Sequence, residues 1–276
     1  MKIADQLGWL RHLDRACAPA LCVAGRVRAS VAYGLLPAVM FTFLVFLHVP
    51  AVAVGQSDRQ ACLAASPNGT DVSALMSLVE TCTATLSWPL SDADRAADLI
   101  QRGVAFRNLG HLEKSLADLS EALHLDDRNV TALKMKAWTL REMHRPAESI
   151  PLYDRAIALA PDAQAYLSRC AARTDLRLFD EAVHDCEEAD RRERSTDSLF
   201  FLALSLSGAG RTGEALMAAN KMLLYQPLWP QHYLLLADLQ ERNGDRNSAR
   251  DTVMRAAELY PDDDSIADLL RRLNSP

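Results

Sequence analysis

Small and apolar residues of this chain recur with a period of 33 or 34 positions between about residue 96 and residue 263. Three synchronised series carry the period: Gly103, Ala137, Cys170, Ala203 and Ala237; Ser115, Ser149, Ala182, Ala215 and Ala249; and Ala122, Ala156, Ala189, Met222 and Ala256. The first series falls on one predicted helix of each period and the other two on the next helix, so small side chains let the two backbones approach closely. Glycines such as Gly110 and Gly210 mark helix ends. The pattern therefore predicts tandem antiparallel helical hairpins.

These positions resemble the tetratricopeptide-repeat family, whose pattern W-x2-L-G-x2-Y, A-x3-F, P aligns with five units at 96–129, 130–162, 163–195, 196–229 and 230–263. In the second unit the pattern falls on Leu133, Lys136, Ala137, Leu140, Ser149, Tyr153 and Pro161. The third unit departs most, with Arg169, Arg173 and Arg194 at places that are usually apolar or proline. The resemblance implies an all-α solenoid, in which the hairpins stack into a right-handed superhelix.

Weaker helical patterns flank the array on both sides. Residues 55–95 are expected to form an N-terminal cap with a degenerate helical hairpin. The stretch from Asp58 to Trp88 also looks like the N-terminal portion of bacterial exported repeat proteins. Residues 264–276 are expected to form a capping helix, because a terminal unit has to cover its neighbour and the apolar residues are spaced for one helix face: Ile266, Leu269, Leu270 and Leu273.

The N-terminal part of the chain predicts entry into a membrane. Residues 31–54 form an uncharged, mostly apolar run of 24 residues, which is long enough to cross a bilayer core as a helix. We interpret 1–28 as a cytoplasmic basic region and 29–54 as a signal peptide or a transmembrane anchor. Small residues at Ala51 and Ala53 favour cleavage, whereas the long region before the run favours retention. Either way, the positive-inside rule directs the body into the periplasm.

The charge distribution agrees with this division. Before Val54, five basic and two acidic residues give a net charge of +3, which leaves −9 on the remainder of a chain whose total is −6. An acidic body does not favour nucleic acid as a partner, because phosphate binding needs a basic surface. The sequence contains no GxSxG, P-loop or HExxH motif, and its histidines lack metal-site spacing. We therefore expect no enzyme, cofactor, metal or small-molecule substrate.

Four cysteines follow the predicted membrane segment, namely Cys62, Cys82, Cys170 and Cys186. An even number of cysteines suits disulfides in an oxidising compartment. Cys170 and Cys186 occupy facing small-residue positions on the two helices of the third unit, which places them within reach of a bond. Of the two possibilities, the sequence favours a pair of buried free thiols that fill a tight interface over a bond. With a bond there, Cys62 and Cys82 would pair and fix the N-terminal cap.

The family resemblance implies a concave groove that binds a protein or peptide segment, lined by the first helix of each unit. Helical spacing assigns these residues to that groove: Arg107, Lys134, Trp138, Arg141, Leu167, Phe200, Leu204, Leu234, Asp238 and Glu241. Trp138 and Arg141 are residue types common in binding hot spots. In the alternative interpretation, Lys134 and Arg141 are solvated surface charges and Trp138 covers its own unit.

Two functions therefore remain open from the sequence. The first is a non-catalytic scaffold or adaptor of the bacterial cell envelope, which binds a protein or peptide in the groove. The second is a structural or assembly protein, in which the repeat array and the membrane segment self-associate. The first is the leading hypothesis and the second is the alternative.

Overall fold

The computed structural model describes residues 51–64, 71–225 and 229–274, and the side chains of α1 from residue 57 onward. These residues form thirteen α-helices and no strand. The helices are α1 (Ala51–Ala64), α2 (Val72–Leu86), α3 (Asp92–Asn108), α4 (Leu112–Leu125), α5 (Val130–Glu142), α6 (Pro146–Leu159), α7 (Ala163–Asp175), α8 (Phe179–Arg192), α9 (Thr196–Gly208), α10 (Thr212–Met222), α11 (Pro230–Arg242), α12 (Arg246–Leu259) and α13 (Asp264–Asn274).

The predicted membrane segment lies almost entirely outside the described residues. Residues 1–28 and 29–50 belong to the part that is not described, and α1 begins at Ala51, so it crosses the boundary expected after residue 54. In the described ranges, no helix has both the length and the apolar character needed to cross a membrane. The interpretation of 29–54 as a signal peptide or anchor therefore stays a prediction.

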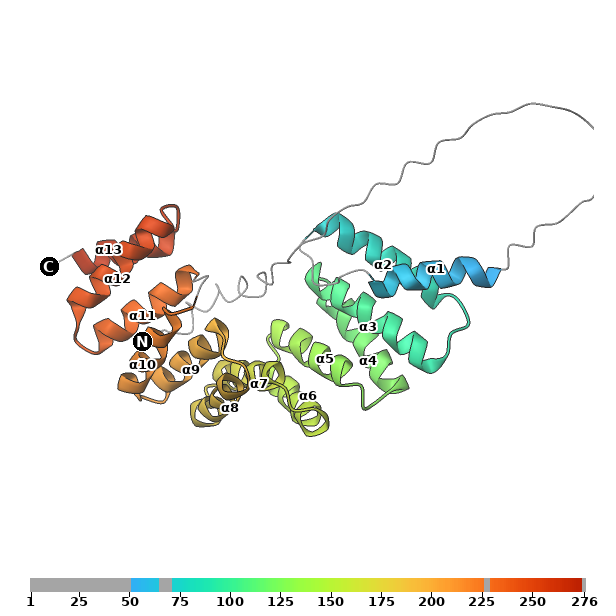
Figure 1. Cartoon of the computed structure of the whole chain (residues 1–276), viewed down its shortest axis with the longest axis horizontal. Coiled ribbons are helices and arrows are strands. Elements are labelled where there is room, and N and C mark those ends of the chain that lie inside the picture. Colours follow the sequence, from blue (N-terminus) through green and yellow to red (C-terminus); the bar gives the residue numbers. More distant parts are fainter. Residues whose placement is uncertain (1–50, 65–70, 226–228, 275–276) are drawn as a thin grey trace, which may run out of the picture.

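Consecutive helices pair into hairpins that stack along an arc (Figure 1). Each odd-numbered helix from α1 to α11 contacts the next odd-numbered helix along the chain. Among the described helices, no even-numbered helix contacts another even-numbered one. The odd-numbered helices therefore form the inner side of the arc and the even-numbered helices the outer side.

Left-handed residues end the first helix of each of the five hairpins from α3–α4 to α11–α12. Gly110, Gly210 and Gly244 have φ values of 77°, 79° and 85°, and His144 and Arg177 take the same place in the second and third of these hairpins with φ values of 59° and 62°. A left-handed residue after a helix lets its last carbonyls accept backbone hydrogen bonds from the turn. The turn therefore repeats with the same period as the small residues.

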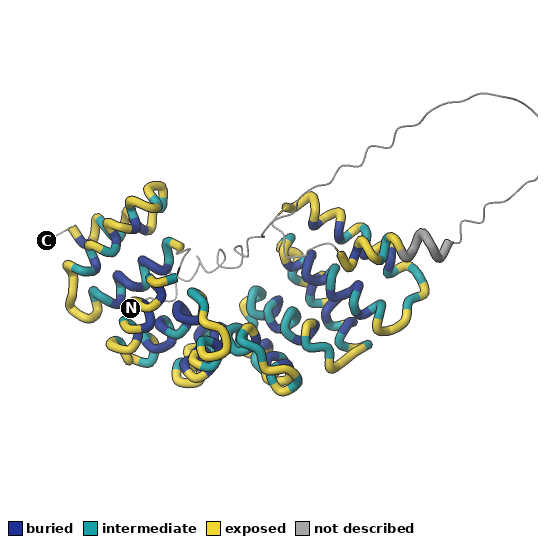
Figure 2. The backbone as a smooth tube through the Cα atoms, in the orientation of Figure 1, coloured by how far each residue is buried: buried dark blue, intermediate teal, exposed yellow. Residues whose placement is uncertain are grey.

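Small residues allow the two helices of a hairpin to pack closely. At Gly103 an added Cβ would lie 3.0 Å from Cγ of Leu119 on the partner helix. Ala137 and Ala203, at the equivalent positions, are completely buried. Figure 2 shows that buried positions concentrate where neighbouring helices meet, whereas turns and outward faces are exposed. The core is thus a continuous layer along the arc, as expected for stacked hairpins.

The two ends of the array are built differently. At the C-terminal end, α13 buries Ile266 and Leu273 against the last hairpin, and they are 1% and 0% exposed. At the N-terminal end, α1 and α2 form a further hairpin whose small core contains Cys62 and Cys82. The C-terminal end is therefore closed by a single amphipathic helix, and the N-terminal end by a disulfide-containing hairpin.

Candidate protein-binding surface

Arg107 and Trp138 contact each other on the inner side of the arc. Arg107 of α3 is 6% exposed, and its guanidinium lies 3.9 Å from the ring centroid of Trp138 on α5. Its Nε is also 3.9 Å from a carboxylate oxygen of Glu142. A cation stacked on an indole ring at this distance is favourable. Trp138 thus joins two hairpins, with one face of its ring covered by Arg107.

The other predicted basic residues pair with carboxylates of the following hairpin. Lys134 Nζ lies 2.6 Å from Asp162, and Arg141 Nε lies 2.6 Å from Asp175. The guanidinium of Arg141 also lies 5.7 Å from the ring centroid of Phe201 on α9, so this side chain links three consecutive hairpins. The basic patch expected in the groove is therefore neutralised by the protein itself.

Apolar side chains occupy the middle of the inner side. Leu167 on α7, Leu204 on α9 and Leu234 on α11 are half-buried and pack against the main core cluster. Phe200 does not belong to this surface, because it is 1% exposed and its ring packs edge-on against those of Phe201 and His232 at centroid distances of 5.4 and 5.3 Å. The structure thus places Phe200 in the core and leaves a strip of three leucines that solvent reaches.

Acidic residues at the far end of the inner side are also paired. Asp238 lies 2.9 Å from Arg242, and Glu241 lies 2.8 Å from Arg272 of α13. Burial raises the pKa of Asp238, and the positive charge of Arg242 opposes this effect. Among the described charged residues predicted to line the groove, each therefore has an oppositely charged neighbour.

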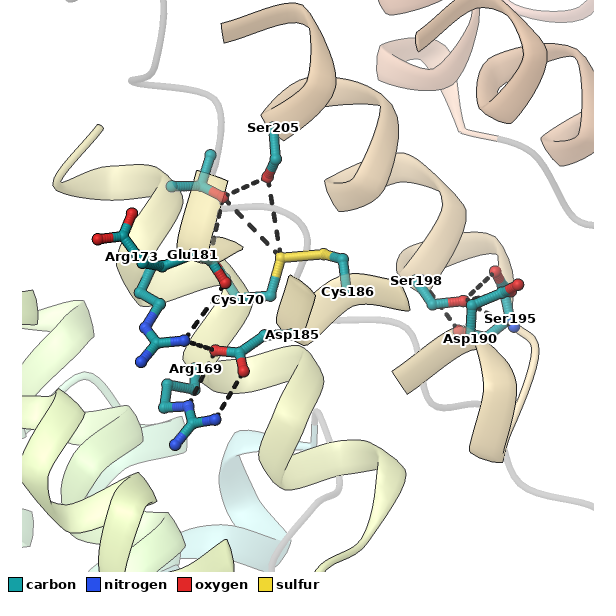
Figure 3. The surroundings of a disulfide bond; sticks show 11 residues. Arg169, Cys170, Arg173, Glu181, Asp185, Cys186, Asp190, Ser195, Ser198 and Ser205 are labelled. Carbon is teal, nitrogen blue, oxygen red and sulfur yellow. Dashed lines mark hydrogen bonds and ion pairs between the residues drawn. A yellow bond between two sulfur atoms is a disulfide. The ribbon is translucent and has the colours of Figure 1, made fainter. Parts of the chain in front are cut away.

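A buried ion cluster in the third predicted unit was not anticipated from the sequence. Arg169 donates two hydrogen bonds of 2.6 and 2.9 Å to Asp185, and Arg173 donates a third of 2.7 Å, while Asp185 is completely buried (Figure 3). Arg102 and Asp118 form the same two-bond pair in the first unit. In both pairs the arginine precedes its aspartate by 16 residues, which is also the separation of Cys170 and Cys186. This spacing is the signal that the sequence contains. Two of the arginines that depart from the repeat pattern, Arg169 and Arg173, thus hold the two helices of their hairpin together.

The four cysteines of the body form two disulfides in the structure. One bond joins Cys62 of α1 to Cys82 of α2, with the two Cα atoms 5.1 Å apart. The other joins Cys170 of α7 to Cys186 of α8, with the Cα atoms 5.4 Å apart (Figure 3). Each bond links the two helices of one hairpin. A free-thiol pair at Cys170 and Cys186 is therefore not what the structure contains.

A small pocket opens on the array next to one of the half-buried leucines. A pocket of about 120 Å³ lies beside Leu167, where the beginnings of α7 and α9 meet the end of α8. Within the described ranges, no group of three histidine, cysteine or acidic side chains is arranged to hold a metal ion. Half-buried apolar side chains framed by paired charges suit contact with another polypeptide.

The fold and this surface define an α-solenoid of stacked helical hairpins. The family model for the tetratricopeptide repeat matches residues 231–263. The solved structure of PilW, a type IV pilus biogenesis factor, is 16% identical and covers 80% of this chain and 99% of its own, with a TM-score of 0.67. The structure of pilF from Pseudomonas aeruginosa is also 16% identical and covers 79% of this chain and 99% of its own, with a TM-score of 0.65. These findings place one tetratricopeptide repeat at residues 231–263 and give the described residues the fold of these two solved structures.

Two further relatives extend the comparison. MamA from Desulfovibrio magneticus RS-1 is 17% identical and covers 63% of this chain and 98% of its own, with a TM-score of 0.57. Protein FlbA of Caulobacter vibrioides is 32% identical over 115 residues, which is 40% of this chain. The matched region is 19% of FlbA, so the chain corresponds to about a fifth of that protein. Proteins of this fold typically act in protein–protein interaction or assembly.

Proposed function

We propose that this protein is a non-catalytic scaffold, which binds a protein or peptide segment on the inner side of its arc. The observation that carries the proposal is the strip formed by Leu167, Leu204 and Leu234 on three consecutive odd-numbered helices. Half-buried leucines on a concave surface gain apolar contact when a partner covers them. The pilus biogenesis role of PilW, a protein of the same fold, supports an interaction function.

Arg141 is a residue type common in binding hot spots, but its charge is already paired within the protein, so we assign it a supporting role in binding. A partner that drew Arg141 away from Asp175 would have to replace an ion pair whose side chains are only 17% and 23% exposed. Such a replacement brings little net gain, because the lost pair and the new one compensate each other. We therefore place the binding energy in the leucine strip and assign orientation of the partner to the polar residues around it.

We further propose that the protein acts in the bacterial cell envelope. The two disulfides support this location, because such bonds persist in oxidising compartments. The uncharged run of residues 31–54 supports export, with that segment either retained as an anchor or removed. The described residues carry the binding function in both cases.

In-cell photo-crosslinking tests the binding surface. A photoreactive phenylalanine at Leu204 should give a discrete adduct with a partner. The same residue at Met217, which is 61% exposed on the outer helix α10, is the matched control and should not give that adduct. Equal adduct patterns from both positions would contradict an inner binding surface. An adduct with a second copy of this chain would instead favour the assembly function.

A further inference from the structure

Cysteines form the centre of the small core in the first hairpin. Cys62 and Cys82 are completely buried and pack with Leu75, Leu78 and Ala105. Among the described side chains of α1, residues 57–64, Cys62 is the one that is buried, and the rest are half-buried or exposed. A helix of 14 residues has little stability of its own. The position of α1 on the array therefore depends strongly on the bond from Cys62.

An ion pair orients α1 but does little to hold it. Arg59 lies 2.7 Å from Asp94 and 3.4 Å from Asp98 on α3. Asp98 is completely buried, and neither of its carboxylate oxygens accepts a hydrogen bond. The cost of removing such a carboxylate from water offsets much of its attraction to the guanidinium. If α1 moved away, Asp98 would regain water and that cost would disappear.

The second disulfide lies in a different setting. Cys170 and Cys186 join α7 and α8, and both of these helices also contact neighbouring hairpins. Sγ of Cys170 lies 3.8 Å from Oγ of Ser205 on α9 (Figure 3). In contrast, α1 contacts only α2 and α3 among the described helices. Breaking the second bond leaves its hairpin packed on both sides, whereas breaking the first releases the one buried side chain among the described side chains of α1.

We propose that the Cys62–Cys82 disulfide is a redox latch on the N-terminal end of the array. A dithiol reductant transfers two electrons and two protons to the sulfur–sulfur bond, becomes a cyclic disulfide itself and leaves thiols at Cys62 and Cys82. The step frees α1 from α2 and α3. It exposes an apolar end face formed by Leu75, Leu78 and Ala105.

Hydrogen–deuterium exchange of the full chain, with and without dithiothreitol, tests the latch. Reduction should accelerate amide exchange in residues 57–64 by at least about tenfold, while α5 to α13 change by less than about twofold. The double variant Cys62→Ser/Cys82→Ser should show the same release of α1 without any reductant. The matched variant Cys170→Ser/Cys186→Ser should leave exchange in α1 unchanged.

Two results would overturn the latch. One is exchange in residues 57–64 that is the same in oxidised protein, reduced protein and the Cys62→Ser/Cys82→Ser variant. The other is a loss of protection throughout the array in that variant, because it keeps the second disulfide and should keep α5 to α13 folded. The test does not depend on binding at the leucine strip, so it is independent of the proposed function.

Discussion

Acidification should destabilise the protein through one buried histidine. His232 of α11 is completely buried, and its Nδ1 accepts a hydrogen bond of 2.9 Å from the backbone N–H of Trp229. Its Nε2 has no hydrogen-bond partner, and the ring packs against Phe200. Burial lowers the pKa of His232 from its usual value near 6.5 to about 4. The folded protein therefore keeps this imidazole neutral at pH values where the unfolded chain is already protonated.

The size and the direction of the effect follow from this difference in pKa. A decrease from 6.5 to about 4 corresponds to roughly 3 kcal/mol, since one pKa unit is worth about 1.36 kcal/mol. Between these two pKa values the unfolded state binds more protons than the folded state. The free energy of unfolding therefore has its full value above the unfolded pKa and decreases as the pH falls towards the folded pKa. About 2 kcal/mol of the free energy of unfolding should be lost by about pH 5, and most of the remainder by about pH 4.

Urea unfolding between about pH 7.5 and pH 4 measures this loss against a His232→Asn variant. Asparagine offers an oxygen to the N–H of Trp229 but does not titrate. The free energy of unfolding of the wild type, relative to the variant, should fall by roughly 3 kcal/mol across this range. The other histidines in the described part of the chain are exposed, and they are present in both proteins. A constant difference between the two proteins, or an NMR titration giving His232 a pKa near 6.5, would refute the reasoning.

Two substitutions test the packing. Gly208→Ala should destabilise the protein by about 1–3 kcal/mol, because the new Cβ would collide with the ring of Phe179. Gly213→Ala is the control, since a Cβ added there would have no atom within 4 Å. Equal melting temperatures of the two variants would contradict the close contact at Gly208. Asp185→Ala should cost about 3–5 kcal/mol in urea unfolding, because it leaves two partly buried arginines without their shared carboxylate. Exposed Asp180→Ala should change stability little, and a similar loss in both variants would contradict a special role for the buried carboxylate.

The repeated helices could be predicted from the sequence because their spacing is local and periodic. Their spacing alone identifies Ala137 and Ala203 as contact positions, and both are completely buried where two helices meet. The turn residues repeat in the same way, and the expected solenoid fold is that of PilW and pilF. In a solenoid the helices of a hairpin pack mainly on the adjacent hairpins, so the period of the sequence predicts which helices meet.

The contacts and the burial of individual inner side chains could not be predicted from the spacing within a single helix. Helical spacing puts Arg141 on the inner side, but its environment depends on Asp175 and Phe201, which are contributed by the next two hairpins. Phe200 has the correct spacing for the groove, and yet the following hairpin covers it with His232. Pairing residues that are one period apart would have found the partner of Arg141, because Asp175 follows it by 34 positions.

The contact of the odd-numbered helices along the inner side, without a matching contact on the outer side, determines how the arc deforms. We expect neighbouring hairpins to tilt about the contacts between their odd-numbered helices. Tilting changes the separation of the even-numbered helices, while links such as the Arg141–Asp175 pair keep their length. We therefore expect a change of curvature to alter the spacing of the even-numbered helices, while the ion pairs between the odd-numbered helices stay intact.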